Sequence, residues 1–153
     1  MLRELYSNYT CKQVKENNEI VLINPFYETE DSVRHVLSKK DEKDNSMLDV
    51  TKYENEADSA NEYLSEQSHM HLKESLANYN KMEKNGISVL ADLGVYHHKS
   101  MYKELVDYES SSSKKYDAPM KGFCLYHQKD FDNLSEEQKQ KLIEHHDKAL
   151  KIT

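Results

Sequence analysis

The sequence predicts an α/β protein with a small parallel sheet of about four strands flanked by helices. Amphipathic segments with helical spacing alternate along the chain with short apolar runs. The apolar runs are nearly continuous, which is typical of strands that are covered on both faces. Regular alternation of such strands with helices favours parallel pairing. The 153 residues fit a single domain, 1–153, and show no internal repeat or linker.

The first half of the chain predicts two helices and two strands. Apolar residues at helical spacing predict a helix over 2–16, and the run from 19 to 24 has four consecutive apolar residues between polar ends. Thr29 is the expected N-cap of the next helix, since acidic residues follow it in the first turn. Residues 41–46 predict a loop, and residues 47–51 predict a short second strand.

The second half of the chain continues the alternation of helix and strand. Its expected elements are a helix over 58–84, a strand over 87–93, a helix over 98–109, a strand over 120–126 and a helix from 135 to about 151. Asn85-Gly86 is a typical helix terminator. Ser135 followed by Gln138 is a capping-box pattern. Cys124 is expected to be a small buried hydrophobe in the fourth strand.

Charge and composition exclude several classes of protein. Acidic residues outnumber basic ones by 28 to 21, and the net charge of −7 argues against binding to a nucleic-acid backbone. The chain has no apolar run long enough to span a membrane. Residues 1–6 lack the apolar core of a signal peptide, so a cytoplasmic location is expected. Cys11 and Cys124 form no disulfide framework.

The candidate site lies where the predicted strands end. In open parallel sheets, ligands bind outside the carboxyl ends of the strands. The candidate ligand-binding residues at these ends are Asn24, Tyr27, Asp92, Tyr96, His97, Tyr126 and His127. Polar and aromatic side chains of this kind suit a small-molecule pocket. They also suit an ordinary loop surface, so both interpretations stay open.

No catalytic or metal-binding motif accompanies this set. The chain has three glycines and no GxxxxGK[ST] phosphate loop, so ATP hydrolysis is not expected. Asp92 is instead expected to accept hydrogen bonds from loop amides. The paired histidines 69/71, 97/98 and 145/146 have spacings that point their rings to different sides of a helix, so no metal site is expected. No nucleophile motif is present, and no cofactor is expected.

Three segments of the chain, read in order, resemble a known family. They are residues 18–32, the strand end 91–94 followed by residues 107–109, and residues 124–131. Together they resemble the MEDS domain, a sensory module named after methanogen proteins and the DcmR regulator. The matching positions are Asp92, Tyr108, Glu109, Cys124, Tyr126 and Phe131. The resemblance implies a three-layer fold related to RecA and KaiC, without the P-loop.

The resemblance also implies a non-enzymatic regulatory or sensory domain in signal transduction, acting through a small ligand or a protein partner. One alternative is a nucleotide- or metal-dependent enzyme centred on Asp92, with His97 or His127. A second alternative is a purely structural interaction protein. A homodimer is expected, with the helix over 2–16 near its interface, because an unpaired sheet edge is a template for pairing with another chain.

Overall fold

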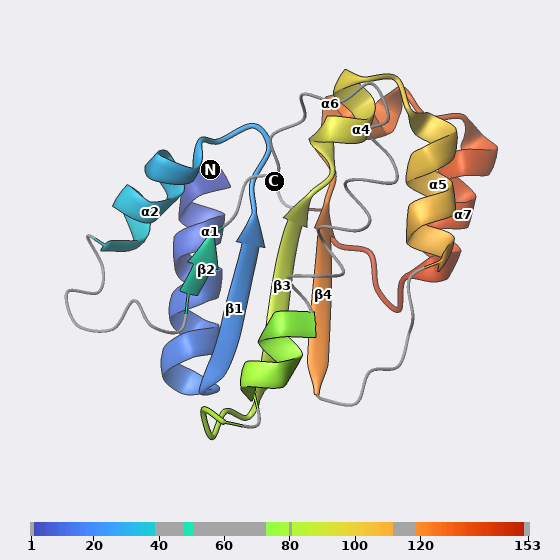
Figure 1. Cartoon of the computed structure of the whole chain (residues 1–153). Coiled ribbons are helices and arrows are strands. Elements are labelled where there is room, and N and C mark those ends of the chain that lie inside the picture. The colour runs from blue at the N-terminus through green and yellow to red at the C-terminus, as the bar shows by residue number, and fades with distance from the viewer. Residues whose placement is uncertain (1, 39–47, 51–72, 80, 112–118, 152–153) are drawn as a thin grey trace. The chain divides into compact units, whose positions relative to one another are not determined.

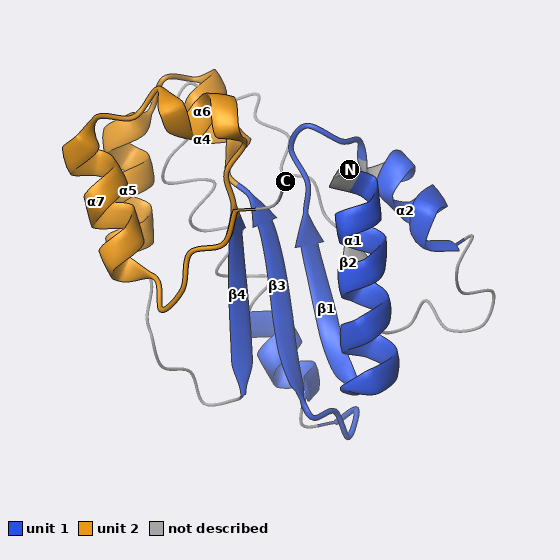
Figure 2. Cartoon of the chain, turned by 180° about the vertical axis from the view of Figure 1, so that it is seen from behind, with its two compact units in different colours: residues 1–92, 116–124 blue, residues 93–115, 125–153 orange. Residues whose placement is uncertain are grey.

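A computed structural model describes residues 2–38, 48–50, 73–79, 81–111 and 119–151 of the chain (Figure 1). The chain divides into two compact units (Figure 2). Unit 1 comprises residues 1–92 and 116–124, and unit 2 comprises residues 93–115 and 125–153. Each unit is described by itself. The predicted loop over 41–46 and most of the predicted helix over 58–84 lie outside the described residues.

Unit 1 is built on a small sheet. Its strands are β1 (Glu19–Asn24), β2 (Leu48–Val50), β3 (Gly86–Asp92) and β4 (Met120–Leu125), whose last residue counts with unit 2. The strand order is β2-β1-β3-β4. β1 is parallel to both of its neighbours, with Ile23 opposite Val50 on β2 and opposite Leu90 on β3. The predicted α/β class with a small parallel sheet is confirmed for β2, β1 and β3.

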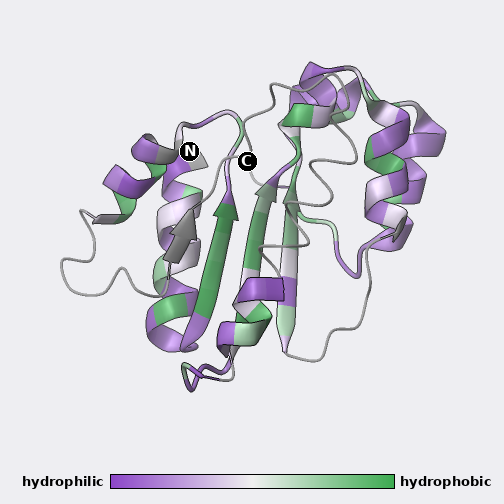
Figure 3. Cartoon of the chain, in the orientation of Figure 1, coloured by the Kyte–Doolittle hydropathy of each residue, from purple (hydrophilic) through white to green (hydrophobic). Residues whose placement is uncertain are grey.

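The core of unit 1 lies on the two central strands. Val21 and Ile23 of β1 and Ile87 and Leu90 of β3 are buried. Figure 3 shows most of the length of both strands in the hydrophobic colour. This is the pattern expected of a strand that helices cover on both faces, because neither face can then carry polar side chains into water.

Helices lie on both faces of this sheet. α1 (Leu2–Cys11) continues into the π-helical turn η1 (Lys12–Glu16) on one face, and the helical residues 73–79 lie on the opposite face (Figures 1 and 2). α2 (Glu30–Ser38) follows β1. The hydroxyl of Thr29 accepts a hydrogen bond from the Ser32 amide at 3.1 Å, which confirms Thr29 as the cap.

The buried face of α1 and η1 is more polar than the sequence pattern indicates. Tyr6 is buried as expected, but Ser7, Thr10 and Gln13 are buried with it, whereas Tyr9 is only half-buried. The buried residues therefore recur at the helical spacing that the sequence predicts. However, they lie about one position further along the chain than predicted. Gln13 tolerates burial because its side-chain oxygen accepts hydrogen bonds from Asn17 and Lys121.

The helix before β3 ends earlier than predicted. Residues 73–79 are helical, but residues 81–83 form a turn and Glu83 has a φ of 52°. Gly86 is not the helix terminator that the Asn-Gly pair predicts, because it is already the first residue of β3. A Cβ atom at this position would lie 2.8 Å from the Pro119 carbonyl oxygen. Gly86 is therefore required by a close approach of backbone, not by a helix end.

Unit 2 contains four described helices: α4 (Gly94–His98), α5 (Tyr102–Ser111), α6 (Gln128–Asp132) and α7 (Glu136–His145). The short helices α4 and α6 were not predicted. α5 begins at Tyr102 instead of 98, because Ser100 has a φ of 55° and separates it from α4. The capping box of Ser135 and Gln138 is confirmed, but α7 ends at His145 instead of 151, since His146 is extended.

Cys124 is half-buried, so the prediction that it is a small buried hydrophobe is wrong. Its strand, β4, is the last in the strand order, whereas a central strand would be covered from both sides. Lys121, Gly122 and Phe123 on the same strand are exposed.

The described helices are short. α1, α5 and α7 have 10 residues each. Among the described residues, no helix has the length and apolar character needed to cross a membrane.

Candidate functional site

The candidate site lies at the carboxyl ends of β1 and β3. After β1 the chain places β2 on one side of that strand and β3 on the other, so the strand order reverses between β1 and β3. Open α/β sheets bind ligands at such a reversal, outside the carboxyl ends of the strands. Asn24 ends β1, and Asp92 ends β3.

Asp92 connects the two strand ends. Its side chain is nearly inaccessible, with the residue only 2% exposed. Its Oδ2 accepts a hydrogen bond from the backbone amide of Tyr27 at 3.3 Å. This bond confirms that Asp92 accepts from a loop amide, and it fixes the loop after β1 against the end of β3. The ring of Tyr27 is exposed and meets the ring of Phe26 edge-on at 5.0 Å.

Tyr6 of α1 lies next to these groups. α1 begins at the end of the sheet where the arrowheads of β1 and β3 lie (Figure 1). Tyr6 is completely buried, and its hydroxyl has no hydrogen-bond partner within the described part of the chain. Burial raises the pKa of this hydroxyl most, and the nearby carboxylates of Asp92 and Glu28 raise it further. Burial and these two negative charges therefore favour the neutral form of the Tyr6 hydroxyl.

Glu28 ties the loop to both flanking helices. Its Oε2 accepts a hydrogen bond from Arg3 Nε at 2.8 Å and another from the Ser32 hydroxyl at 3.1 Å. Arg3 lies three residues before Tyr6, so the two side chains share one face of α1. We call Tyr6, Tyr27, Glu28 and Asp92 the carboxyl-edge cluster, and Arg3 lies at its exposed rim.

The seven predicted site residues divide between the two units. Asn24, Tyr27 and Asp92 belong to unit 1, whereas Tyr96, His97, Tyr126 and His127 belong to unit 2. Within unit 1, the structure brings Tyr27 and Asp92 into direct contact. Asn24 is the half-buried last residue of β1.

In unit 2, His97 and Tyr126 belong to one aromatic group. The buried His97 ring lies 5.6 Å from the Tyr102 ring and 6.4 Å from the Tyr126 ring. Tyr96 is buried beside Tyr108, with ring centroids 5.8 Å apart. Burial raises the pKa of Tyr96 most, followed by the charges of Tyr108, Glu109 and Glu104. His127 is the N-cap of α6, where its backbone carbonyl accepts the first helical hydrogen bonds.

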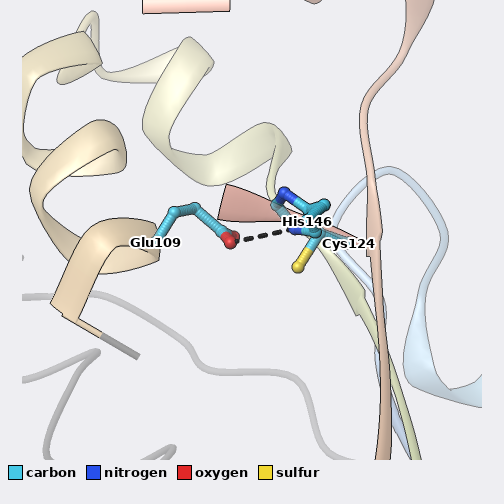
Figure 4. A group of neighbouring side chains, drawn as sticks. All are labelled: Glu109, Cys124 and His146. Atoms are coloured by element: carbon cyan, nitrogen blue, oxygen red, sulfur yellow. Dashed lines mark ion pairs between the residues drawn. The ribbon is translucent and has the colours of Figure 1, made fainter. Parts of the chain in front are cut away.

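Glu109 and His146 form an ion pair within unit 2 (Figure 4). His146 Nε2 lies 3.2 Å from Glu109 Oε2, and His146 Nδ1 donates to the Leu142 carbonyl at 2.6 Å. Both ring nitrogens of His146 face oxygen atoms. The contact with Glu109 therefore needs a hydrogen either on Nε2 of His146, as in an ion pair, or on the Glu109 carboxyl group. His146 therefore caps the end of α7 and ties it to α5.

Sequence reasoning missed three groups at the site: Arg3, Tyr6 and Glu28. Tyr6 was interpreted as core because of its helical spacing, which is correct for its ring but not for its hydroxyl. One signal could have found them. A helix joined to β1 by the short turn at residues 17–18 must run back along the sheet, which brings its N-terminal residues to the carboxyl ends of the strands.

A second polar cluster lies elsewhere in unit 1. Glu19 is buried, and its two carboxylate oxygens accept hydrogen bonds from the Ser88 hydroxyl at 2.5 Å and from Lys121 Nζ at 2.6 Å. Lys121 also donates to Gln13 at 3.2 Å. The hydrogen bonds join β1, β3, β4 and η1, and this cluster satisfies its own charges.

No protein-family model, curated protein or solved structure gives a significant match to the chain. The resemblance to MEDS domains therefore depends on the sequence segments alone.

Proposed function

We propose that the chain is a non-enzymatic regulatory or sensory domain that binds a small ligand at the carboxyl-edge cluster. One observation carries the proposal. The buried carboxylate of Asp92 ends β3 where the strand order reverses, and its charge reaches the buried hydroxyl of Tyr6, which has no hydrogen-bond partner among the described residues.

The unsatisfied hydroxyl favours ligand binding at this position. A buried hydroxyl without a partner destabilises a fold by about 1–3 kcal/mol. A ligand that completes its hydrogen bonding recovers part of that free energy. Structural hydroxyls are normally paired, since polar groups are rarely buried alone. The same position suits a ligand because polar contacts hold the loop after β1 there, among them Tyr27 with Asp92 and Glu28 with Arg3, and a polar ligand can compete for them.

These two contacts provide a mechanism for regulation. A ligand that interacts with Asp92 or Glu28 competes with Tyr27 or Arg3, so it favours a different conformation of the loop over 25–29. A ligand shifts such an equilibrium only through its different affinities for the two conformations. The signal then passes to a protein partner or to a second copy of the chain. The MEDS likeness, with the RecA-like three-layer arrangement that it implies, supports this proposal.

Thermal unfolding of the full chain tests the proposal. The probes are ATP with Mg²⁺, putrescine, glutamate and MgCl₂ alone, which represent a nucleotide, an amine, a carboxylate and a cation. At least one of them should raise the unfolding temperature, because a ligand of the native state stabilises it by mass action. The shift should be lost in Asp92→Asn and kept in Asp107→Asn, which removes the same charge from an exposed position on α5.

Two results would overturn the proposal. One is that no probe class shifts the unfolding temperature, and the other is that the shift persists in Asp92→Asn. An assay of ATP turnover separates the enzymatic alternative. Turnover that disappears in Asp92→Ala would establish an enzyme, whereas we expect none, because the chain has no glycine-rich phosphate loop.

A further inference from the structure

We infer that Glu109 and His146 form a proton-dependent clasp between α5 and α7, which is closed while the pair holds a proton and opens when it loses that proton. The clasp lies within unit 2 and does not depend on the ligand that we propose for unit 1. The pH is thereby a second signal to which the chain responds.

The contacts of the His146 ring fix the number of protons in the clasp. Nδ1 lies 2.6 Å from the Leu142 carbonyl oxygen, which can only accept, so Nδ1 carries a hydrogen. Nε2 lies 3.2 Å from Glu109 Oε2. In a neutral ring with its hydrogen on Nδ1, Nε2 has a lone pair, which repels a carboxylate oxygen at that distance. The clasp is therefore closed only while one further proton lies on Nε2 or on the Glu109 carboxyl group.

Burial makes the loss of this proton consequential. The Glu109 side chain is 4% exposed and the His146 side chain is 24% exposed, so water screens the repulsion between them poorly. The two side chains must then move apart. His146 is the extended residue after α7, and its backbone amide donates to the Ile143 carbonyl. Its movement releases the Leu142 carbonyl and the tie between α7 and α5.

The carboxylate sets the direction in which the clasp shifts the titration of His146. An isolated histidine has a pKa of about 6.5. The Glu109 carboxylate favours the charged ring and delays the loss of its proton to higher pH, whereas burial of the ring opposes this in part. A protonated His145 ring, 6.1 Å away, also opposes it.

The remaining titratable neighbours carry no charge near neutral pH. The Tyr126 ring lies 6.5 Å from the His146 ring, and the Glu109 carboxylate acts on the Tyr96 phenol, whose pKa is raised mainly by burial. Figure 4 also labels the Cys124 thiol, which Cys124→Ser removes as a control. The proton that opens the clasp is therefore the one shared by Glu109 and His146.

NMR titration of the His146 ring in the full chain tests the inference, in metal-free buffer from about pH 5 to 9. His146→Gln identifies the resonance. We expect the midpoint to lie about one pH unit higher in the wild type than in Glu109→Gln. Asp107→Asn removes an exposed charge of α5 and should keep the wild-type midpoint, as should Cys124→Ser. Equal midpoints in the wild type and Glu109→Gln would overturn the inference, as would a midpoint that follows Cys124 instead.

Hydrogen exchange at the end of α7 shows whether the clasp opens. The protection factor of the His146 amide, which corrects for the intrinsic pH dependence of exchange, should fall as the ring loses its proton. Glu109→Gln should keep this protection at high pH, because its side-chain amide can donate to the lone pair of Nε2 in the neutral ring. Protection that stays constant through the titration of the wild-type ring would overturn the inference.

Urea denaturation gives a readout that does not need the Glu109 variant. The unfolded chain releases the His146 proton at about pH 6.5 and the closed clasp releases it at higher pH, so the folded chain holds the extra proton between these two values. The free energy of unfolding of the wild type should therefore fall as the pH rises through this interval. In His146→Gln the fall should be less steep, by up to about one proton. Identical slopes would overturn the inference.

Discussion

At the scale of single residues, the buried carboxylate of Glu19 depends on Lys121. The ion pair at 2.6 Å joins β1 to β4, and Lys121 is half-exposed, so solvent screens part of its charge. Lys121→Met should lower the free energy of unfolding by about 1–2 kcal/mol, because it removes a charged hydrogen bond from a buried carboxylate. Urea denaturation measures the change.

Lys12→Met is the matched control for this prediction. Lys12 is exposed on η1, so the same substitution there should change the free energy of unfolding by less than about 0.5 kcal/mol. Adding Glu19→Gln to Lys121→Met should recover part of the lost stability, since no buried charge then remains. Equal stability of the Lys121 and Lys12 variants would show that the ion pair contributes nothing.

Tyr9 gives a prediction on pH at the same scale. Burial raises the pKa of its hydroxyl to about 12, with Glu19 adding to the rise and Ser88 opposing it. The unfolded chain has the lower pKa of about 10, so it loses the proton first as the pH rises. The stabilising contribution is therefore complete below pH 10 and is lost between about pH 10 and 12. In urea denaturation over that range, the free energy of unfolding of Tyr9→Phe should fall less steeply with pH than that of the wild type. The difference between the two slopes should correspond to one proton. Identical slopes would contradict the shift.

At the scale of elements, the two described strand glycines make a direct comparison. A Cβ atom at Gly86 would lie 2.8 Å from the Pro119 backbone oxygen, whereas a Cβ atom at Gly122 would meet nothing within 4 Å. Gly86→Ala should therefore destabilise the chain by about 1–3 kcal/mol, because the backbone must shift. Gly122→Ala should be neutral or stabilising by up to about 1 kcal/mol, because it reduces the entropy of the unfolded chain.

Thermal unfolding of both glycine variants measures the difference. If Gly86→Ala is as stable as Gly122→Ala, the close contact between the start of β3 and Pro119 does not exist in solution.

The N-terminus of α7 gives a second prediction for an element. The Ser135 hydroxyl accepts from the Gln138 amide at 3.2 Å, and the Gln138 side chain accepts from the Ser135 amide at 2.9 Å. Ser135→Ala should cost about 1 kcal/mol, the usual effect of losing an N-cap. Ser110→Ala, at an exposed position of α5, is the control and should change little. Chemical denaturation followed by circular dichroism compares them. Equal stability of the two variants would mean that the cap does not support α7.

At the scale of the whole molecule, a homodimer stays a prediction. The apolar side of α1 was expected near its interface, and Tyr6 on that helix is covered within unit 1. The full chain should run as a dimer in light scattering at two concentrations, since two-fold dimers are the commonest soluble assembly. Deleting residues 1–15 should give monomer or aggregate, because it uncovers the sheet. A full chain that stays monomeric at high concentration would refute the dimer.

The sequence by itself determined the α/β class, the positions of β1 and β3 and the caps at Thr29 and Ser135. These features are local, because a run of β-branched residues or a cap depends on neighbours in the chain. Where local signals conflict with packing, prediction failed. α7 ends at His145, although the sequence pattern continues, because His146 is extended and bonds to Leu142 and Glu109.

Only the tertiary structure decided what faces Asp92. The sequence placed Asp92 and Tyr27 at strand ends, and the rule for open sheets predicted that they share one edge. The sequence did not place Arg3, Tyr6 and Glu28 at that edge. To do so requires knowing the direction of α1 relative to β1 and which residues of α1 are buried. It also could not show that β4 is the last strand in the order, which leaves Cys124 half-buried. Helical spacing fixes which residues share a face, but the partner of that face is set by contacts far apart in the sequence.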